Sequence, residues 1–225
     1  MLYDIVSAPT YSAVECHLDA GESIVGDAGA MAWMTDSIQT QTSTRGGLMQ
    51  GLKRKLLAGE SFFQNTYTAE QGPGTIAFAP GAAGDIATYE LSNSELILER
   101  GAFLASQSDV TCDAKWDGFR GLLNEGMFLL RVGGTGTLFF HSYGGLEVVD
   151  VESEYIVDNG HAVAWEPTLE YQLTRGRKIR SFLFSDQLLL RFSGRGRLWV
   201  QSRSAHALAS WVYPFRDVES QNDDD

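Results

Sequence analysis

Short apolar segments, each cut off by glycine or other turn residues, follow one another along most of this chain. Segments of about 4 to 8 residues with alternate apolar positions are typical of half-buried strands, and frequent turns at this spacing indicate a β-sandwich or a barrel. In chain order they read SAVECHL, GTIAF, DIATYEL, SELILE, AFLAS, MFLLRV, GTLFF, LEVVDV, EYIVD, AVAW, LEYQL, SFLF, LLLRFSG and RLWVQS. The pattern predicts an all-β protein.

Helical periodicity is scarce and is confined to two stretches. Arg45 to Leu57 has leucines at positions 48, 52 and 56, and this four-residue spacing suits a short amphipathic helix. Near the end of the chain, Ala205 to Trp211 is expected to form one or two helical turns before Pro214, because proline ends a helix. We therefore expect one or two short helices beside the sheets.

Two short signatures each occur three times. GPGTIAF at Gly72 to Phe78 recurs as GTGTLFF at Gly134 to Phe140 and as GRGRLWV at Gly194 to Val200, at spacings of 62 residues (72 to 134) and 60 residues (134 to 194). In the second signature a glutamate, an isoleucine and an alanine keep the same mutual spacing: Glu22, Ile24 and Ala32; Glu95, Ile97 and Ala105; Glu154, Ile156 and Ala164.

We predict from these signatures three tandem β repeats that form one pseudo-threefold barrel or sandwich. Upstream of each GxG pair lies another apolar segment, so each repeat reads as a strand, a glycine turn and a second strand. One such set cannot bury its own apolar face, whereas three sets packed around a common axis can. A single closed core is the expected result.

The three GxG pairs do not have the context of a phosphate-binding loop. A dinucleotide-binding loop needs a strand before it and a helix after it, whereas each pair here precedes a strand. A turn with positive φ, or a strand crossing where a side chain would collide, is the expected use of these glycines.

Size and charge set the organisation and exclude one class of partner. At 225 residues the chain is long enough to bury a full core, and we expect one triplicated β domain over residues 1–216 followed by an acidic tail at 217–225. The net charge of -12, from 29 acidic and 17 basic residues, repels phosphate backbones, so no nucleic-acid partner is expected. The same charge fits a salt-rich cytoplasm or an acidic mesophilic protein.

The chain shows no signal for export or for membrane spanning. The opening residues contain no basic leader with an apolar run, and nowhere do about 18 apolar residues run together, so we expect a cytoplasmic protein without a transmembrane segment. Cys16 and Cys112 form no CxxC pair and are expected to be buried thiols outside any disulfide framework.

No residue pattern indicates catalysis or a cofactor. The four histidines, at positions 17, 141, 161 and 206, form no HxH or HExxH pair, although a site gathered from distant repeats is a spatial question. No GxSxG elbow accompanies the serines. We therefore expect no enzyme activity, no metal and no cofactor, with a metal-dependent enzyme as the third-ranked hypothesis.

The recurring Glu22, Glu95 and Glu154 leave two alternatives open. If the repeats hold the three glutamates apart, each is an exposed turn carboxylate ahead of a strand. Gathered at an axis, they would raise one another's pKa or bind a cation.

Two further groups of residues are candidate binding sites. Lys53, Arg54 and Lys55 form a basic patch on an acidic chain, and this patch is a candidate contact for a protein partner or an anionic membrane surface. Trp33, Trp165 and His141 are the candidate lining of a ligand pocket between repeats, with core or subunit contacts as the alternative role of the two tryptophans.

The segments GESFFQNTYTAEQGPGTIAFAPGAAGDI, GAFLAS, GTGTLFFHSYGG, VDNGHAVAWE and GRGRLWVQSRS together resemble the altered-inheritance-of-mitochondria (mitochondrial biogenesis) family, a prokaryotic domain of unknown function. The resemblance extends from about Tyr3 to Trp211. It implies a triplicated β structure related to the tryptophan RNA-binding attenuation protein group, often trimeric. It implies no activity and supplies no catalytic residues.

These observations lead to two hypotheses from different classes. The first is a non-enzymatic cytoplasmic β scaffold, expected to be a homotrimer, that acts by binding a protein or a membrane surface. The second is a small-molecule-binding module with a pocket between repeats.

Overall fold

The computed structural model describes residues 1–43, 64–115, 129–175 and 188–216. Its strands are β1 Leu2–Val6, β2 Ala13–Leu18, β3 Ser23–Asp27, β4 Met31–Met34, β5 Ile38–Ser43, β6 Gln64–Ala69, β7 Gly74–Phe78, β8 Ile86–Glu99, β9 Phe103–Gln107, β10 Val110–Lys115, β11 Leu129–His141, β12 Leu146–Val151, β13 Glu154–Asp158, β14 Ala162–Trp165, β15 Leu169–Arg175, β16 Leu188–Gly194 and β17 Gly196–Gln201. The helices are α2 Ala205–Val212 and the short 3-10 turns η1 Arg100–Ala102, η2 Asn159–His161 and η3 Tyr213–Phe215. The all-β prediction is confirmed.

The strands form three sheets, in which every pair of named strands is antiparallel. One has four strands in the order β1-β2-β7-β4, and another has three in the order β13-β16-β15. The largest sheet has the strand order β12-β17-β14-β8-β11-β9-β3-β6-β5, and β10 pairs with β11 beside this path. The described strands fit a sandwich, and their sheet paths have open ends and do not close into a barrel.

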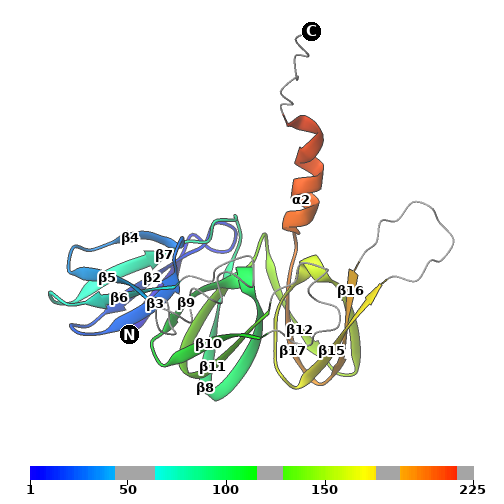
Figure 1. Cartoon of the computed structure of the whole chain (residues 1–225), viewed down its shortest axis with the longest axis horizontal. Helices are drawn as coiled ribbons and strands as arrows, with labels where there is room; N and C mark the ends of the chain where they lie inside the picture. The colour runs from blue at the N-terminus through cyan, green and yellow to red at the C-terminus, as the bar shows by residue number, and fades with distance from the viewer. Residues whose placement is uncertain (44–63, 116–128, 176–187, 217–225) are drawn as a thin grey trace, which may run out of the picture.

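The buried side chains gather in three clusters along the row of strands in Figure 1. Alternation places them: on β2, Val14, Cys16 and Leu18 are buried, while Glu15 and His17 face outward. The first cluster is centred on β2, β3, β6 and β7, the second on β8 and β11, and the third on β14, β16 and β17. The described core is therefore divided among three clusters, where a single closed core was expected.

Two long strands replace four predicted segments. DIATYEL, from its Ile86 onward, joins SELILE in the 14-residue β8. The LLRV of MFLLRV joins GTLFF in the 13-residue β11, and the first two residues of MFLLRV lie outside the described residues. The register between these strands shifts at Gly134, opposite the turn-like Asn93, which has φ 52°. Asn93 of β8 is the extra residue of this bulge, and both strands continue through it.

The two glycines of each GxG pair have different structural uses. The first, at positions 72, 134 and 194, has φ of 121°, 116° and 111°, a conformation that favours glycine. The second glycine makes room for a side-chain oxygen. A Cβ at Gly74 would lie 2.6 Å from Thr35 Oγ1. A Cβ at Gly136 would lie 3.1 Å from Gln107 Oε1, and a Cβ at Gly196 would lie 3.3 Å from Glu166 Oε2. Each of these oxygens accepts a hydrogen bond from the backbone N–H that follows the glycine, at Thr75 (3.1 Å), Thr137 (2.8 Å) and Arg197 (2.9 Å).

Both predicted uses of the GxG glycines are therefore confirmed. Gly136 also has a positive φ, and a side chain at Gly134 or Gly194 would also approach a backbone carbonyl closely. The three loops share this local geometry, while a threefold arrangement of whole repeats stays a prediction.

The C-terminal helix stands away from the sheets (Figure 1). Ser204 caps its start, since the Ser204 hydroxyl accepts a hydrogen bond from the N–H of Ala207 (3.4 Å). The predicted turns at Ala205 to Trp211 are confirmed, and η3 with Pro214 follows the helix directly. The other predicted helix, Arg45 to Leu57, lies outside the described residues.

Candidate functional site

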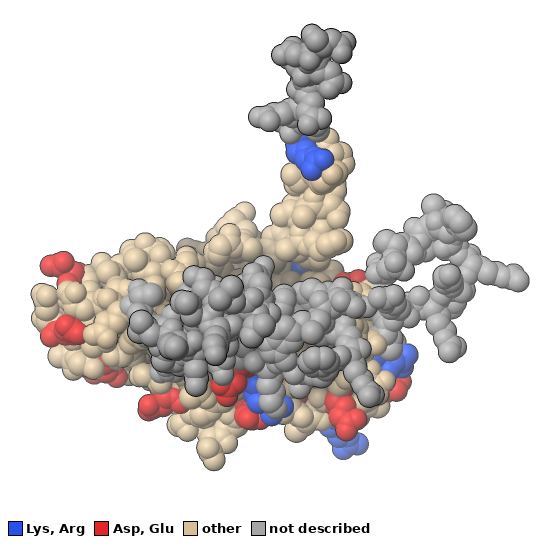
Figure 2. Space-filling view, in the orientation of Figure 1, with Lys and Arg blue, Asp and Glu red and all other residues tan. Residues whose placement is uncertain are grey.

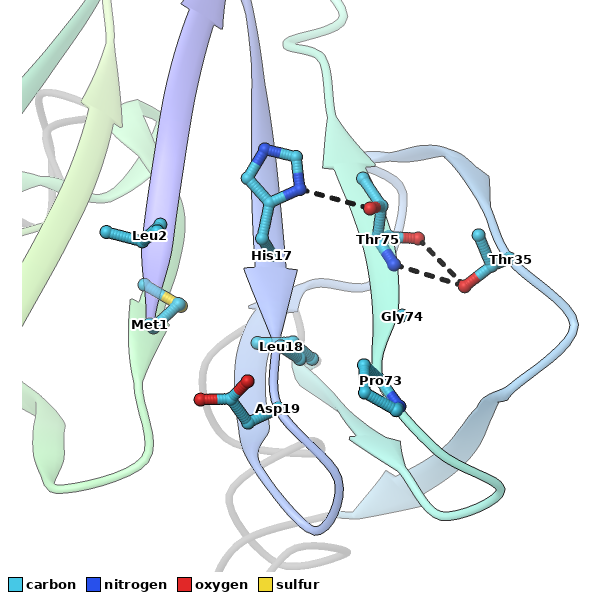
Figure 3. Close-up of a pocket in the computed structure, with 9 residues that line it drawn as sticks. All are labelled: Met1, Leu2, His17, Leu18, Asp19, Thr35, Pro73, Gly74 and Thr75. Atoms are coloured by element: carbon cyan, nitrogen blue, oxygen red, sulfur yellow. Dashed lines mark hydrogen bonds between the residues drawn. The ribbon is translucent and has the colours of Figure 1, made fainter.

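A pocket of about 390 Å³ lies beside β1, β2 and β7 of the four-stranded sheet (Figure 3). Antiparallel pairing sets its walls, because Leu2, His17 and Thr75 are register partners across these three strands. Its lining residues are Met1, Leu2, His17, Leu18, Asp19, Thr35, Pro73, Gly74 and Thr75. The volume is within the range of about 300 to 1,000 Å³ that is usual for small-molecule sites.

A continuous chain of hydrogen bonds crosses this face of the sheet. The Nδ1 atom of His17 lies 3.1 Å from the hydroxyl of Thr75, and its Nε2 atom lies 3.0 Å from a carboxylate oxygen of Asp4. Thr75 is in turn joined to Thr35, whose hydroxyl accepts from the Thr75 N–H and whose own N–H donates to the Thr75 carbonyl (2.9 Å).

The chain places a hydroxyl, an imidazole and a carboxylate in the order found in nucleophilic enzymes. A neutral imidazole has one donor and one acceptor, and both ring nitrogens of His17 have a partner here. The ring therefore has no spare nitrogen for a ligand. The chain of bonds links β1, β2 and β7 across the sheet face, and the Asp4 carboxylate at its end is 71% exposed.

The second candidate surface is the C-terminal segment formed by α2 and η3. All residues from Ala205 to Arg216 are exposed, and the exposed fractions of the large apolar side chains are 44% for Leu208, 68% for Trp211, 44% for Val212, 58% for Tyr213 and 74% for Phe215. Among the described residues, none of these side chains belongs to a buried cluster. This amount of apolar surface on a short projecting segment marks an interaction site.

Two ring contacts form within the segment. The rings of Trp211 and Phe215 are 5.7 Å apart, and the Arg216 guanidinium lies 3.7 Å from the centre of the Tyr213 ring. Leu208, Trp211, Val212 and Phe215 follow the spacing i, i+3, i+4, i+7 of one helical face. His206 and Ser210, four residues apart, lie on the opposite side.

Trp33, Trp165 and His141 lie in three separate places. Trp33 is on β4 of the four-stranded sheet, is 47% exposed, and donates its Nε1–H to Glu15 (2.9 Å). Trp165 is on β14, is fully buried, and packs edge-on against the rings of Tyr171 (5.1 Å) and Phe192 (5.2 Å). Trp165 therefore has the core role that we predict as its alternative to ligand binding.

His141 ends β11, opposite Ile86. Burial lowers the pKa of His141, which favours the neutral imidazole. The pocket in Figure 3 is lined by neither tryptophan nor by His141.

The three recurring glutamates each have a partner of their own. Glu95 pairs with Arg131, Glu154 with Arg191 (3.0 Å), and Glu22 with the amino group of Met1 (3.2 Å). The pKa of the Glu22 carboxyl is lowered, chiefly by the backbone N–H of Asp19. In the described part of the chain, no three His, Cys, Asp or Glu side chains are grouped so that they could hold a metal ion. The first alternative, carboxylates held apart, is the one that the geometry supports.

The remaining predicted positions are the two cysteines and the basic patch. Cys16 is buried, and burial raises the pKa of its thiol to about 12, so the thiol is unreactive at neutral pH. Cys112 is half-buried. The basic patch Lys53, Arg54 and Lys55 lies outside the described residues.

Comparison with known proteins identifies the family. The family model described as mitochondrial biogenesis AIM24 matches residues 3–203. The chain belongs to the AIM24 family. The resemblance drawn from the sequence motifs is therefore confirmed for the family, while the relation to the attenuation-protein group stays a prediction.

Two streptococcal proteins show how far the similarity extends. An uncharacterized protein of Streptococcus pyogenes serotype M6 is 27% identical over 231 residues, which cover 98% of this chain and 93% of that protein. A Streptococcus pyogenes protein of known crystal structure is 26% identical and superposes with a TM-score of 0.79 over 96% of this chain and 99% of that chain. Neither description names an activity or a ligand.

The family match ends at residue 203, immediately before α2. The sequence pattern indicated a helix in this region and did not indicate that the helix is unpacked. One signal was present in the sequence: from Arg203 to Arg216 this acidic chain contains no Asp or Glu.

Proposed function

We propose that this AIM24-family chain is a non-enzymatic scaffold that acts by binding a protein or a membrane surface, and that α2 and η3 make the contact. The exposure of every residue from Ala205 to Arg216 carries the proposal. Fully burying a Leu, Phe or Val side chain contributes about 1.5 to 3 kcal/mol, so a partner that covers this segment gains substantial free energy.

The described sites also favour a binding role over catalysis. The carboxylate beside His17, that of Asp4, is 71% exposed to water, and the recurring glutamates are held in separate ion pairs. In the part of the chain that the structure describes, no helix is both long and apolar enough to cross a bilayer. Contact with a membrane would therefore be made at its surface by the described helix.

The proposal is tested with the variant Leu208→Ser/Trp211→Ser. Light scattering of the whole protein, alone over a range of concentrations and with phospholipid vesicles added, measures its association. We expect the unmodified protein to form either an oligomer, with a homotrimer favoured, or a vesicle-bound form. The variant is expected to lose whichever of these two forms the unmodified protein shows. The thermal midpoint is expected to stay unchanged, since both side chains are exposed. A protein that stays monomeric and unbound, or a variant that associates equally well, would contradict the proposal.

A second candidate function is small-molecule binding. The specific observation for it is the 390 Å³ pocket beside His17 and Thr75. Native mass spectrometry of protein purified without additives tests it: a co-purifying mass that is lost on Thr75→Val supports the pocket, whereas a bare polypeptide mass argues against it.

A further inference from the structure

The projecting segment has the composition of a membrane-interface helix. Leucine, tryptophan, valine and phenylalanine share one face, and a histidine and a serine lie opposite them. Tryptophan and tyrosine are enriched at the level of lipid headgroups because their rings are apolar at one end and polar at the other. Trp211 lies in the last turn of α2 and Tyr213 begins η3 directly after it. This end of α2 is the one farther from the sheets (Figure 1).

The charges around the segment are placed for such a contact. Arg203 and Arg216 flank it, and no acidic residue lies between them. Long basic side chains at the ends of an apolar helix can keep their charges in the headgroup region while their stems lie on apolar surface. Figure 2 shows α2 with no acidic side chain on it; most acidic side chains in this view lie along the lower edge and the far left of the sheets, and one lies beside the base of α2. The upper edge, from which α2 projects, is mostly uncharged in this view.

These observations favour a lipid surface over a second copy of the chain. A bilayer accepts a single helix, because insertion of the apolar face needs no complementary groove. Two copies of the segment would instead bring together arginines of the same sign at both ends.

We propose that α2 and η3 lie in the headgroup region of a phospholipid bilayer, with Leu208, Trp211, Val212 and Phe215 toward the acyl chains. This inference rests on the proposed function and narrows its partner to lipid. The nine residues after Arg216 include five acidic ones, Asp217, Glu219, Asp223, Asp224 and Asp225. They offset the two arginines, so apolar burial drives the binding, and anionic lipid is not required.

Vesicle flotation tests the proposal on the whole protein. The probes are vesicles of zwitterionic phosphatidylcholine and vesicles that also contain anionic phosphatidylglycerol. We expect the unmodified protein to float with both, without stronger binding to the anionic set and with little change as salt is raised. Trp211→Ala/Phe215→Ala should lower the partition coefficient by roughly 30-fold or more, because two buried aromatic rings are lost.

A matched control removes exposed apolar side chains from the sheets. Tyr155→Ala/Ile156→Ala changes two side chains on β13 that are 41% and 48% exposed, and this variant should float like the unmodified protein. Binding that needs anionic lipid, or a Trp211→Ala/Phe215→Ala variant that floats equally, would overturn the inference. The unmodified protein could fail to float and still form an oligomer, measured by light scattering, that Trp211→Ala/Phe215→Ala loses. In that case the lipid inference fails and the proposed association function stands. If neither binding nor an oligomer is seen, both fail.

Discussion

At the scale of single residues, the three GxG pairs show how one sequence motif meets two backbone requirements. Gly72 and Gly134 have almost the same φ, 121° and 116°, but different surroundings. A Cβ at Gly134 would lie 2.4 Å from the carbonyl oxygen of Asp109, whereas nothing lies within 4 Å of a Cβ at Gly72. The two positions therefore separate the effect of backbone conformation from the effect of close approach.

Gly72→Ala and Gly134→Ala are expected to destabilise the protein by different amounts. Gly72→Ala should lower the free energy of unfolding by about 1 to 3 kcal/mol, the usual cost of a strained backbone conformation. Gly134→Ala should lower it by roughly 2 kcal/mol more, because the backbone of β11 must also move away from Asp109. Urea unfolding of the two variants measures the difference. Equal losses would show that close approach does not restrict Gly134.

At the scale of structural elements, a cluster of side chains around Glu166, the Glu166 cluster, links the turn between β14 and β15 to β17. Glu166 accepts hydrogen bonds from the N–H and the guanidinium of Arg197 (both 2.9 Å) and from the hydroxyl of Tyr89 (3.3 Å). The Arg197 guanidinium also lies 5.4 and 5.2 Å from the ring centres of Tyr89 and Trp199. Burial raises the pKa of the Glu166 carboxyl, but the donors of Arg197 lower it by more, so the pKa is below its usual value of 4.5.

The Glu166 cluster predicts a pH-dependent contribution to stability. A carboxyl group whose pKa is lowered in the folded protein stabilises it above the unfolded pKa, and this contribution is lost as the pH falls through the folded pKa. Glu166→Gln should therefore be less stable than the unmodified protein at neutral pH, with a difference that shrinks below about pH 4. Urea midpoints across this range measure it. A difference that stays constant with pH would mean that the charge of Glu166 contributes nothing.

Strands were the most predictable elements of this chain, because short apolar segments bounded by turn residues mark them in the sequence. GTIAF, LEVVDV, EYIVD, AVAW and LLLRFSG match observed strands from end to end. The predicted list missed β1, β3, β4, β5, β6 and β10. Of these, β1, β4 and β5 lie at sheet edges and β10 lies beside the main path, whereas β3 and β6 lie inside the largest sheet. On β4 all four residues, Met31 to Met34, are exposed, so no buried face marks the strand in the sequence.

At the scale of the whole molecule, sequence reasoning identified the fold class and the family but not the candidate site. The sequence predicts the same alternative roles for Trp33 and Trp165, yet Trp33 is half-exposed on β4 and Trp165 is fully buried in the core. Tertiary packing decides this difference, and a sequence pattern does not contain it. The homotrimer, the single domain over residues 1–216 and the threefold arrangement of repeats stay predictions.

The exposure of α2 could not be predicted for a related reason. Apolar spacing shows that a helix has one apolar face, but it does not show whether a sheet, a second chain or a bilayer covers that face. The structure shows the face uncovered by any described residue, and the charges around it favour a bilayer.

Hydrogen exchange at the C-terminal segment tests the central claim most directly. Amide exchange over residues 205–216 is measured in the free protein and with an excess of phosphatidylcholine vesicles. An exposed, projecting helix exchanges quickly, and docking on a surface slows its exchange. Our account predicts slower exchange for this segment when vesicles are present and no change in β14 or β17. Exchange over residues 205–216 that stays fast at every vesicle concentration would contradict it.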